Sequence, residues 1–189
     1  MPDPPDKQSL QELLQRAASG DESAWRVIIE TYTPRVYGLI RAQSGSADLA
    51  EEITQSTFCT MVAKIEGYTE LGRFESWLFR IAMNRLRDEM RRRKRQARPV
   101  EEEVLQGLAG SARSSPPESQ LEDQATGQSL RRAVEQLSEA DRRIIHLRHS
   151  AELSFKQIAD ILGQPLGTVL ARHHRALKKL RDLIGPETP

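Results

Sequence analysis

Apolar residues recur at helical spacing through the first half of the chain, and no stretch alternates as a half-buried strand would. The first apolar stripe ends at Gly20, a residue type that commonly terminates helices, and it consists of Leu10, Leu13, Leu14 and Ala17. Asp21 is a suitable N-cap for a second helix, whose stripe consists of Trp25, Ile28, Ile29, Tyr32, Val36, Leu39 and Ile40. Pro34 lies inside that stripe and predicts a kink or an interruption, because proline lacks the backbone N–H of a helix interior.

Two more amphipathic helices follow in the N-terminal half. The first, over residues 47–66, comes after Gly45-Ser46, and its inner positions are Ile53, Phe58, Met61, Val62 and Ile65. A loop over residues 67–72 leads to the next helix, which begins near Arg73 with Phe74, Trp77, Leu78, Ile81 and Leu86 on its inner face. This helix runs into an uninterrupted basic cluster, Arg91–Arg95.

The character of the chain changes between residues 97 and 129. Arg98-Pro99, Glu101–Glu103 and Ser114–Pro117 make this segment polar and rich in proline, so it cannot bury enough apolar surface to fold alone. We therefore predict a flexible acidic linker at 97–129 between a helical domain at 1–96 and a second one at 130–189. The predicted fold class is all-α, with two small helical domains.

The C-terminal block has the pattern of a helix-turn-helix. Ser138 and Asp141 resemble a capping box, as do Ser154 and Gln157, and Gly163 stands where a left-handed residue would end the second of these helices. A last helix is predicted from Thr168, with Val169, His173, Ala176, Leu177, Leu180 and Ile184 on its inner face. Two short helices across a glycine-containing turn predict that the last helix lies in the major groove of DNA.

Charge and composition support a nucleic-acid partner. The net charge is only +1, but residues 80–95 hold eight basic side chains against Asp88 and Glu89, and residues 130–189 hold 11 basic against 7 acidic ones. Basic patches attract phosphate backbones by releasing counterions. The single cysteine, the polar N-terminus and the absence of an apolar run of about 18 residues predict a soluble, cytoplasmic protein without a membrane span. No phosphate loop, nucleophile elbow or pair of catalytic carboxylates is present, so we expect neither catalysis nor a cofactor.

Two sets of motifs resemble bacterial RNA polymerase sigma factors of the extracytoplasmic-function (ECF) group. The stretch from Leu137 to Arg148, together with Leu153 to Val169, resembles sigma region 4. Independently, three stretches resemble region 2: Tyr32-Thr-Pro-Arg-Val-Tyr37, Glu51-Glu-Ile-Thr-Gln-Ser-Thr-Phe58 and Phe74-Glu-Ser-Trp-Leu-Phe-Arg-Ile-Ala-Met-Asn84. The resemblance covers residues 21–95 and 130–184 in the expected order, and it implies a factor that directs core RNA polymerase to promoters and helps to melt them.

The resemblance implies a role for each surface. The polar face of the third helix would bind the β′ clamp of core RNA polymerase through Asp48, Glu51, Glu52 and Gln55. The −10 promoter element would be bound by Tyr68, Arg80, Asn84, Arg85, Arg87, Arg91, Arg92, Arg93, Lys94 and Arg95. Phe74 and Trp77 are predicted to pack in the core instead, because both lie on the apolar stripe.

Region 4 would bind the −35 element and the β flap of the polymerase. Its predicted DNA contacts are Leu166, Thr168, Leu170, Ala171, Arg172, Arg175, Lys178 and Lys179. The family commonly has Lys-Ser-Arg after Gly-Thr-Val, whereas this chain has Leu170-Ala171-Arg172, so the −35 sequence cannot be read from the resemblance. Many relatives are restrained by an anti-sigma factor, and such a partner is possible here.

Other interpretations are less well supported by the residues. A free-standing helix-turn-helix regulator would bind DNA tightly without polymerase, and it remains the alternative function. An RNA-binding adaptor would need exposed aromatic platforms, but aromatics make up 5% of the chain and lie largely in the apolar stripes. His146 and His149 lack a cysteine or carboxylate at ligand spacing, and Cys59 lacks a second cysteine, so neither a metal site nor redox sensing is expected.

Overall fold

The computed structural model describes the backbone of residues 7–96 and 118–184 and the side chains of residues 9–96 and 127–184. Within these ranges the chain forms helices and no strand, which confirms the all-α prediction. The helices are α1 (Lys7–Ala18), α2 (Glu22–Ser44), α3 (Ala47–Lys64), the short 3-10 helix η1 (Ile65–Gly67), α4 (Phe74–Gln96), α5 (Glu118–Glu135), α6 (Glu139–His149), α7 (Phe155–Leu162) and α8 (Leu166–Ile184).

Local capping explains where α2 begins, and buried residues explain why it continues past Pro34. The Asp21 carboxylate accepts hydrogen bonds from the backbone N–H groups of Ser23 and Ala24, as expected for an N-cap. The helix then continues to Ser44 without the interruption that Pro34 predicted as one outcome. The missing proline N–H costs a hydrogen bond, but the residues on either side, among them Tyr32 and Val36, are fully buried and hold the helix together.

Two helices begin earlier than the apolar spacing predicted. Helix α5 starts at Glu118, inside the segment we interpreted as linker, and not near Leu130. Helix α8 starts at Leu166 and not at Thr168, because the Pro165 carbonyl already accepts hydrogen bonds from the N–H groups of Thr168 and Val169.

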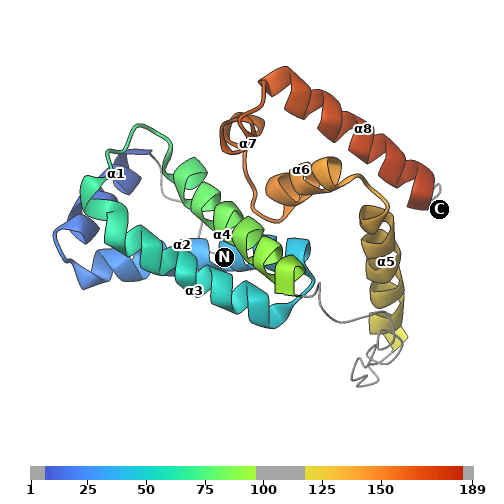
Figure 1. Ribbon diagram of the computed structural model, residues 1–189, viewed down its shortest axis with the longest axis horizontal. Helices are drawn as coiled ribbons and strands as arrows, with labels where there is room; N and C mark the ends of the chain where they lie inside the picture. The colour runs from blue at the N-terminus through green and yellow to red at the C-terminus, as the bar shows by residue number, and fades with distance from the viewer. Residues whose placement is uncertain (1–6, 97–117, 185–189) are drawn as a thin grey trace.

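One hydrophobic core spans helices from both halves of the chain. It joins α1–α4 to Ile144, Leu147, Leu153, Ile158 and Val169, all of which are almost completely buried. A smaller cluster lies between α5, α6 and α8 and contains Ala133, Leu137, Ile145, Ala176 and Leu180. In Figure 1, α7 lies next to α4, whereas α5 and α8 lie on the far side of α6 and α7.

Some residues that we placed on inner faces are exposed in the structure. Those with exposed fractions near or above 40% are Ile29, Val62, Leu177 and Ile184. Each lies at the edge of its stripe, and the neighbouring helices cover only the centre of that stripe. The predicted core positions Phe74 and Leu78 are buried, while Trp77 is half-buried.

Candidate nucleic-acid and polymerase interfaces

The outer face of α3 carries the predicted polymerase-binding residues side by side. Asp48, Glu51, Glu52 and Gln55 are all exposed, whereas Leu49, Ile53 and Met61 on the opposite face are buried in the core. Ser46 caps the helix through a hydrogen bond from the N–H of Leu49 to its hydroxyl oxygen, at 3.3 Å. The result is a rigid helix that presents an acidic and amide surface to a partner.

The end of α4 is a basic projection in which some cations are fixed and others are not. Glu89 accepts hydrogen bonds from Arg92 at 2.6 and 2.9 Å and from Arg93 at 2.7 Å. These two guanidinium groups lower the pKa of Glu89 to about 2. Among the described residues, Arg91, Lys94 and Arg95 have no acidic side chain within salt-bridge distance.

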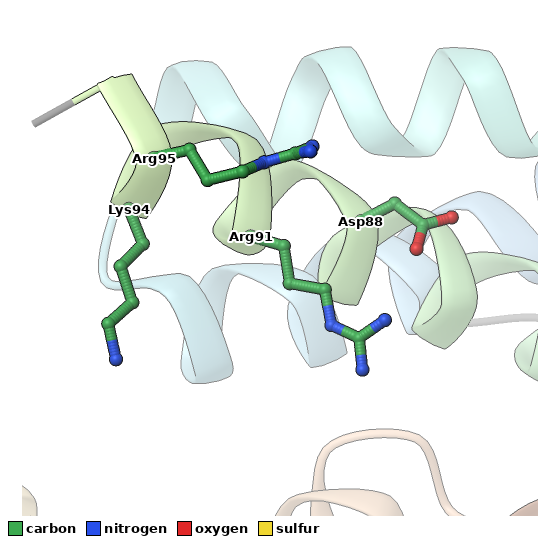
Figure 2. Close-up of a pocket in the computed structure, with 4 residues that line it drawn as sticks. All are labelled: Asp88, Arg91, Lys94 and Arg95. Carbon is green, nitrogen blue, oxygen red and sulfur yellow. The ribbon is translucent and has the colours of Figure 1, made fainter.

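The unpaired cations at this end of α4 border an open hollow. Figure 2 shows that Arg91 and Lys94 point off the same side of the helix, while Arg95 reaches back along it towards Asp88. All of the basic residues from Arg91 to Arg95 are exposed. They can contact phosphates along a nucleic-acid backbone without first breaking contacts of their own, except at the pair held by Glu89.

Tyr68 is less available than the sequence suggested. Its ring stacks on Trp77 with centroids 4.5 Å apart and contacts the edge of Phe74 at 5.9 Å. Its hydroxyl donates a hydrogen bond to Glu70 at 2.8 Å, and burial, followed by Glu70, raises the pKa of this phenol. The half-buried Trp77, which we assigned to the core, therefore forms part of the same aromatic surface at the start of α4.

The other predicted −10 residues on α4 already have partners in the structure. Arg85 donates hydrogen bonds to the Thr60 hydroxyl, and Arg87 donates one to the Asn84 side chain at 3.2 Å. Arg80 is exposed on α4 but contacts α7 of the C-terminal half.

The helix-turn-helix is built by local capping rules. Ser154 and Gln157 form a complete capping box: the Ser154 N–H donates to the Gln157 side chain at 2.7 Å, and the Gln157 N–H donates to the Ser154 hydroxyl at 3.3 Å. Gly163 ends α7 with φ of 62°, the left-handed conformation that glycine adopts most easily. Ser138 forms only one half of a capping box, in which the Asp141 N–H donates to the Ser138 hydroxyl oxygen. The Asp141 carboxylate accepts a hydrogen bond from the Ser138 hydroxyl and not from the Ser138 backbone N–H.

The structure divides the predicted −35 residues into three groups. Thr168, Ala171, Arg175 and Lys178 are exposed along one side of α8. In contrast, Arg172 lies 3.5 Å from the Asp141 carboxylate, and Lys179 donates a hydrogen bond to the Gln136 carbonyl at 2.7 Å. Leu166 and Leu170 are exposed apolar residues with exposed fractions of 45% and 42%.

Four histidines lie in the C-terminal half, and sequence reasoning did not separate them. His174 is exposed and shares its side of α8 with Ala171 and Lys178, because residues three and four apart lie on one helix face. His149 and His173 place their Nε2 atoms 3.3 Å apart. His146 is partly buried, and burial, followed by Arg142, lowers its pKa to about 4. In the described part of the chain, no three metal-binding side chains come together.

Comparison with protein families matches both halves of the chain. Residues 28–96 match the model described as Sigma-70 region 2, and residues 133–182 match the model described as Sigma-70, region 4. The first match covers most of α2 together with α3 and α4, and the second covers the end of α5, α6, α7 and nearly all of α8. These helices carry the two sets of surfaces described above. No helix among the described residues is long and apolar enough to cross a membrane.

Individual relatives show the same likeness over most of the chain. The ECF RNA polymerase sigma factor SigW of Bacillus subtilis is 30% identical over 90% of this chain and 96% of its own length. SigE of Mycolicibacterium smegmatis, also named an ECF RNA polymerase sigma factor, is 34% identical over 88% of this chain, and the match spans 65% of its length.

Two solved structures have a similar fold. One is the sigma factor RpoE from Bartonella quintana with the anti-sigma factor NepR, at a TM-score of 0.66 and 23% identity, covering 87% of this chain and 98% of that one. The other is CnrH with the cytosolic domain of CnrY, at a TM-score of 0.67 and 21% identity, covering 94% and 98%.

Proposed function

The chain belongs to the ECF sigma factors, and we propose that it binds core RNA polymerase, directs it to promoters through −10 and −35 recognition, and helps to melt them. Sigma factors are non-enzymatic initiation factors, so the chemistry would be performed by the polymerase. We place this activity in the cytoplasm, where the polymerase acts. A free-standing helix-turn-helix regulator is the weaker candidate, since region 2 would then have no role.

One observation carries the proposal: the chain has two separate exposed surfaces suited to nucleic acid and a third surface suited to a protein. The basic end of α4 and the exposed side of α8 both present cations. The outer face of α3 presents three carboxylates and an amide in one row, at Asp48, Glu51, Glu52 and Gln55. A regulator that binds DNA alone does not require such an acidic face.

The assignments of individual residues follow from their environments. We propose Arg91, Lys94 and Arg95 as phosphate contacts near the −10 element, because they are exposed and free of acidic partners within the described residues. We propose Arg175 and Lys178 as the main contacts of α8, together with Thr168 and Ala171. Arg172 and Lys179 would first have to leave Asp141 and Gln136, so they are the weaker candidates.

Polymerase binding is tested by reversing charge on α3. The double variant Glu51→Lys/Glu52→Lys should bind core polymerase at least about tenfold more weakly, since complementary charges across an interface turn repulsive. The matched control is Glu12→Lys/Glu30→Lys, which reverses two exposed charges on α1 and α2. Unchanged affinity of the α3 variant would remove the assignment of this face.

Promoter recognition is tested on α8. Arg175→Ala should reduce run-off transcription from a promoter with an intact −35 element more than from one with an altered element. Arg131→Ala, which removes an exposed cation from α5, serves as the control. Equal losses on both promoters would mean that Arg175 contacts phosphate alone. Tight promoter binding by the free protein, without co-elution with core polymerase, would favour the free-standing regulator.

We propose a regulator as a further protein partner. One structure of similar fold is a sigma factor in complex with an anti-sigma factor, and another holds CnrH together with the cytosolic domain of CnrY. We propose that an anti-sigma protein binds this chain as well. Pull-down with the chain as bait, with and without core polymerase as competitor, would test whether such a protein shares a surface with the polymerase.

A further inference from the structure

A groove between the end of α4 and α6 gathers cations from both halves of the chain. Its volume is about 960 Å³, within the range of pockets that hold small organic ligands. Leu49, near the start of α3, also lines it. In Figure 2, Arg91 and Lys94 point from α4 towards the faint orange ribbon of the C-terminal half, which contributes α6 to the lining. The groove is therefore walled by helices that lie far apart in the sequence.

The lining of this groove is strongly cationic. It contains six arginine and lysine side chains but only one carboxylate, that of Glu139. Glu139 pairs with Arg143, and Arg93 pairs with Glu89, which is not part of the lining. Among the described residues, four lining cations have no acidic side chain within salt-bridge distance: Arg87, Arg91, Lys94 and Arg142.

These four like charges come from two separate helices, three from α4 and Arg142 from α6. Like charges that share one groove repel each other unless a counter-charge lies between them. Arg142 is half-buried, so water screens its charge less than that of an exposed side chain. The pKa of His146 on the same wall is lowered to about 4 by burial and then by Arg142, as expected for a wall with positive potential. A multivalent anion in the groove would relieve this repulsion.

The groove also has an apolar floor beside its cations. Leu49, Met83 and Leu86 are almost completely buried beneath it, while Met90 has an exposed fraction of 49%. An inorganic anion would leave the Met90 side chain in water. A ligand that carries both phosphates and a flat ring would use both features, since methionine sulfur contacts aromatic rings favourably and arginine binds phosphate through paired N–H groups.

We propose that this groove binds a nucleoside polyphosphate, with its phosphates at Arg91, Lys94 and Arg142 and its base over Met90. The site goes beyond the proposed function, because no step of promoter recognition requires a small ligand. Arg91 and Lys94 are also our proposed phosphate contacts near the −10 element, so an occupied groove would withhold two cations from DNA. Only this consequence rests on the proposed function.

The phosphate part of the site is tested by calorimetric titration of the full-length free protein with ATP at low salt. The parent should bind one ATP saturably. Arg142→Gln should weaken binding by about tenfold or more, because it removes a charge-assisted hydrogen bond to phosphate. Arg142→Lys keeps the charge and should retain most of the affinity. The control is Arg132→Gln, the same change at an exposed position on α5, which should leave the affinity unchanged.

The nucleoside part of the site is tested at Met90. Met90→Gln should weaken ATP binding about threefold to tenfold, since the base loses apolar contact, and should leave binding of inorganic tripolyphosphate unchanged. Val62→Gln is the matched control, because Val62 lies on α3 outside the groove with a similar exposed fraction of 48%. Tripolyphosphate that binds the parent as tightly as ATP would overturn the assignment of a nucleoside ligand.

Three other results would overturn the site itself. The first is no saturable ATP binding up to about 1 mM. The second is an equal loss in Arg132→Gln and Arg142→Gln, which would mean diffuse attraction to the whole protein. The third is a short single-stranded oligonucleotide that binds more tightly than ATP and loses as much in Arg142→Gln, which would assign the groove to nucleic acid. All of these titrations omit polymerase and promoter, so failure to co-elute with core polymerase would refute the sigma-factor proposal and leave the nucleotide site standing.

Discussion

Arg35→Met tests how much the buried ion pair at the centre of the molecule contributes to stability. The substitution keeps most of the side-chain volume but removes the three hydrogen bonds to Ala151 and Glu75. It also removes the guanidinium from the faces of Tyr32 and Phe79, whose ring centroids lie 5.5 and 5.4 Å away. The Glu75 carboxylate would remain, with a side-chain exposure of 16% and no cation beside it.

The expected loss of stability follows from the Glu75 carboxylate, which is left without a cation. Removing one partner of a buried pair costs about 3–5 kcal/mol, because the remaining charge stays desolvated and unpaired. Water reaches part of Glu75, so we expect the lower end, about 3 kcal/mol in the free energy of unfolding. Adding Glu75→Gln should recover part of this loss, since the double variant no longer buries an unpaired charge.

Urea unfolding measures the effect, followed by tryptophan fluorescence and by circular dichroism. Both tryptophans lie in the N-terminal half, so coincidence of the two signals also tests whether the shared core unfolds as one unit. Arg26→Met, an exposed position on the same helix, should change the unfolding free energy by less than about 0.5 kcal/mol. A loss below about 1 kcal/mol for Arg35→Met, with an unchanged m-value, would refute the assignment of a buried, desolvated pair.

Three further predictions concern caps and protonation. Ser154→Ala removes the cap of α7 and should cost about 1 kcal/mol, seen as a melting temperature lower by about 2–4 °C; an unchanged melting temperature would contradict the capping assignment. The pKa of Glu89 is lowered from 4.5 to about 2, so its contribution to stability is complete above pH 4.5 and declines as pH falls towards 2. The difference in urea midpoint between the parent and Glu89→Gln should therefore shrink over that range. A constant difference would contradict the stabilising role of the Glu89 carboxylate. The pKa of His146 is lowered from 6.5 to about 4, so folding favours the neutral ring, and the free energy of unfolding should fall as pH drops from 6.5 to 4. His146→Gln should show a shallower decline. Identical pH profiles for the two proteins would exclude this histidine as the cause.

Rules that act within a few residues determined much of this protein. The N-cap at Asp21, the capping box of Ser154 and Gln157, and the left-handed Gly163 all form as the sequence predicted. Each needs only a side chain and the backbone of its own turn, so its energy does not depend on the rest of the chain. The same holds for the exposed acidic face of α3, because helical periodicity alone separates Glu51 and Glu52 from Ile53.

Helix starts and stripe edges were less predictable. The exposure of Leu177 depends on which neighbours cover α8, and periodicity carries no information about those neighbours. Trp77 illustrates the same point, since its half-buried ring is placed by Tyr68 from the preceding loop.

Only the tertiary structure decided which charges are free and which are neutralised. Arg35 contacts a carbonyl 116 residues away, and Arg80 meets an aspartate 80 residues further along the chain. In sequence these arginines look no different from Arg91 or Arg175, which remain exposed. Local pattern fixes the secondary structure because its hydrogen bonds close within a turn, whereas a long-range ion pair exists only once separate helices have packed together.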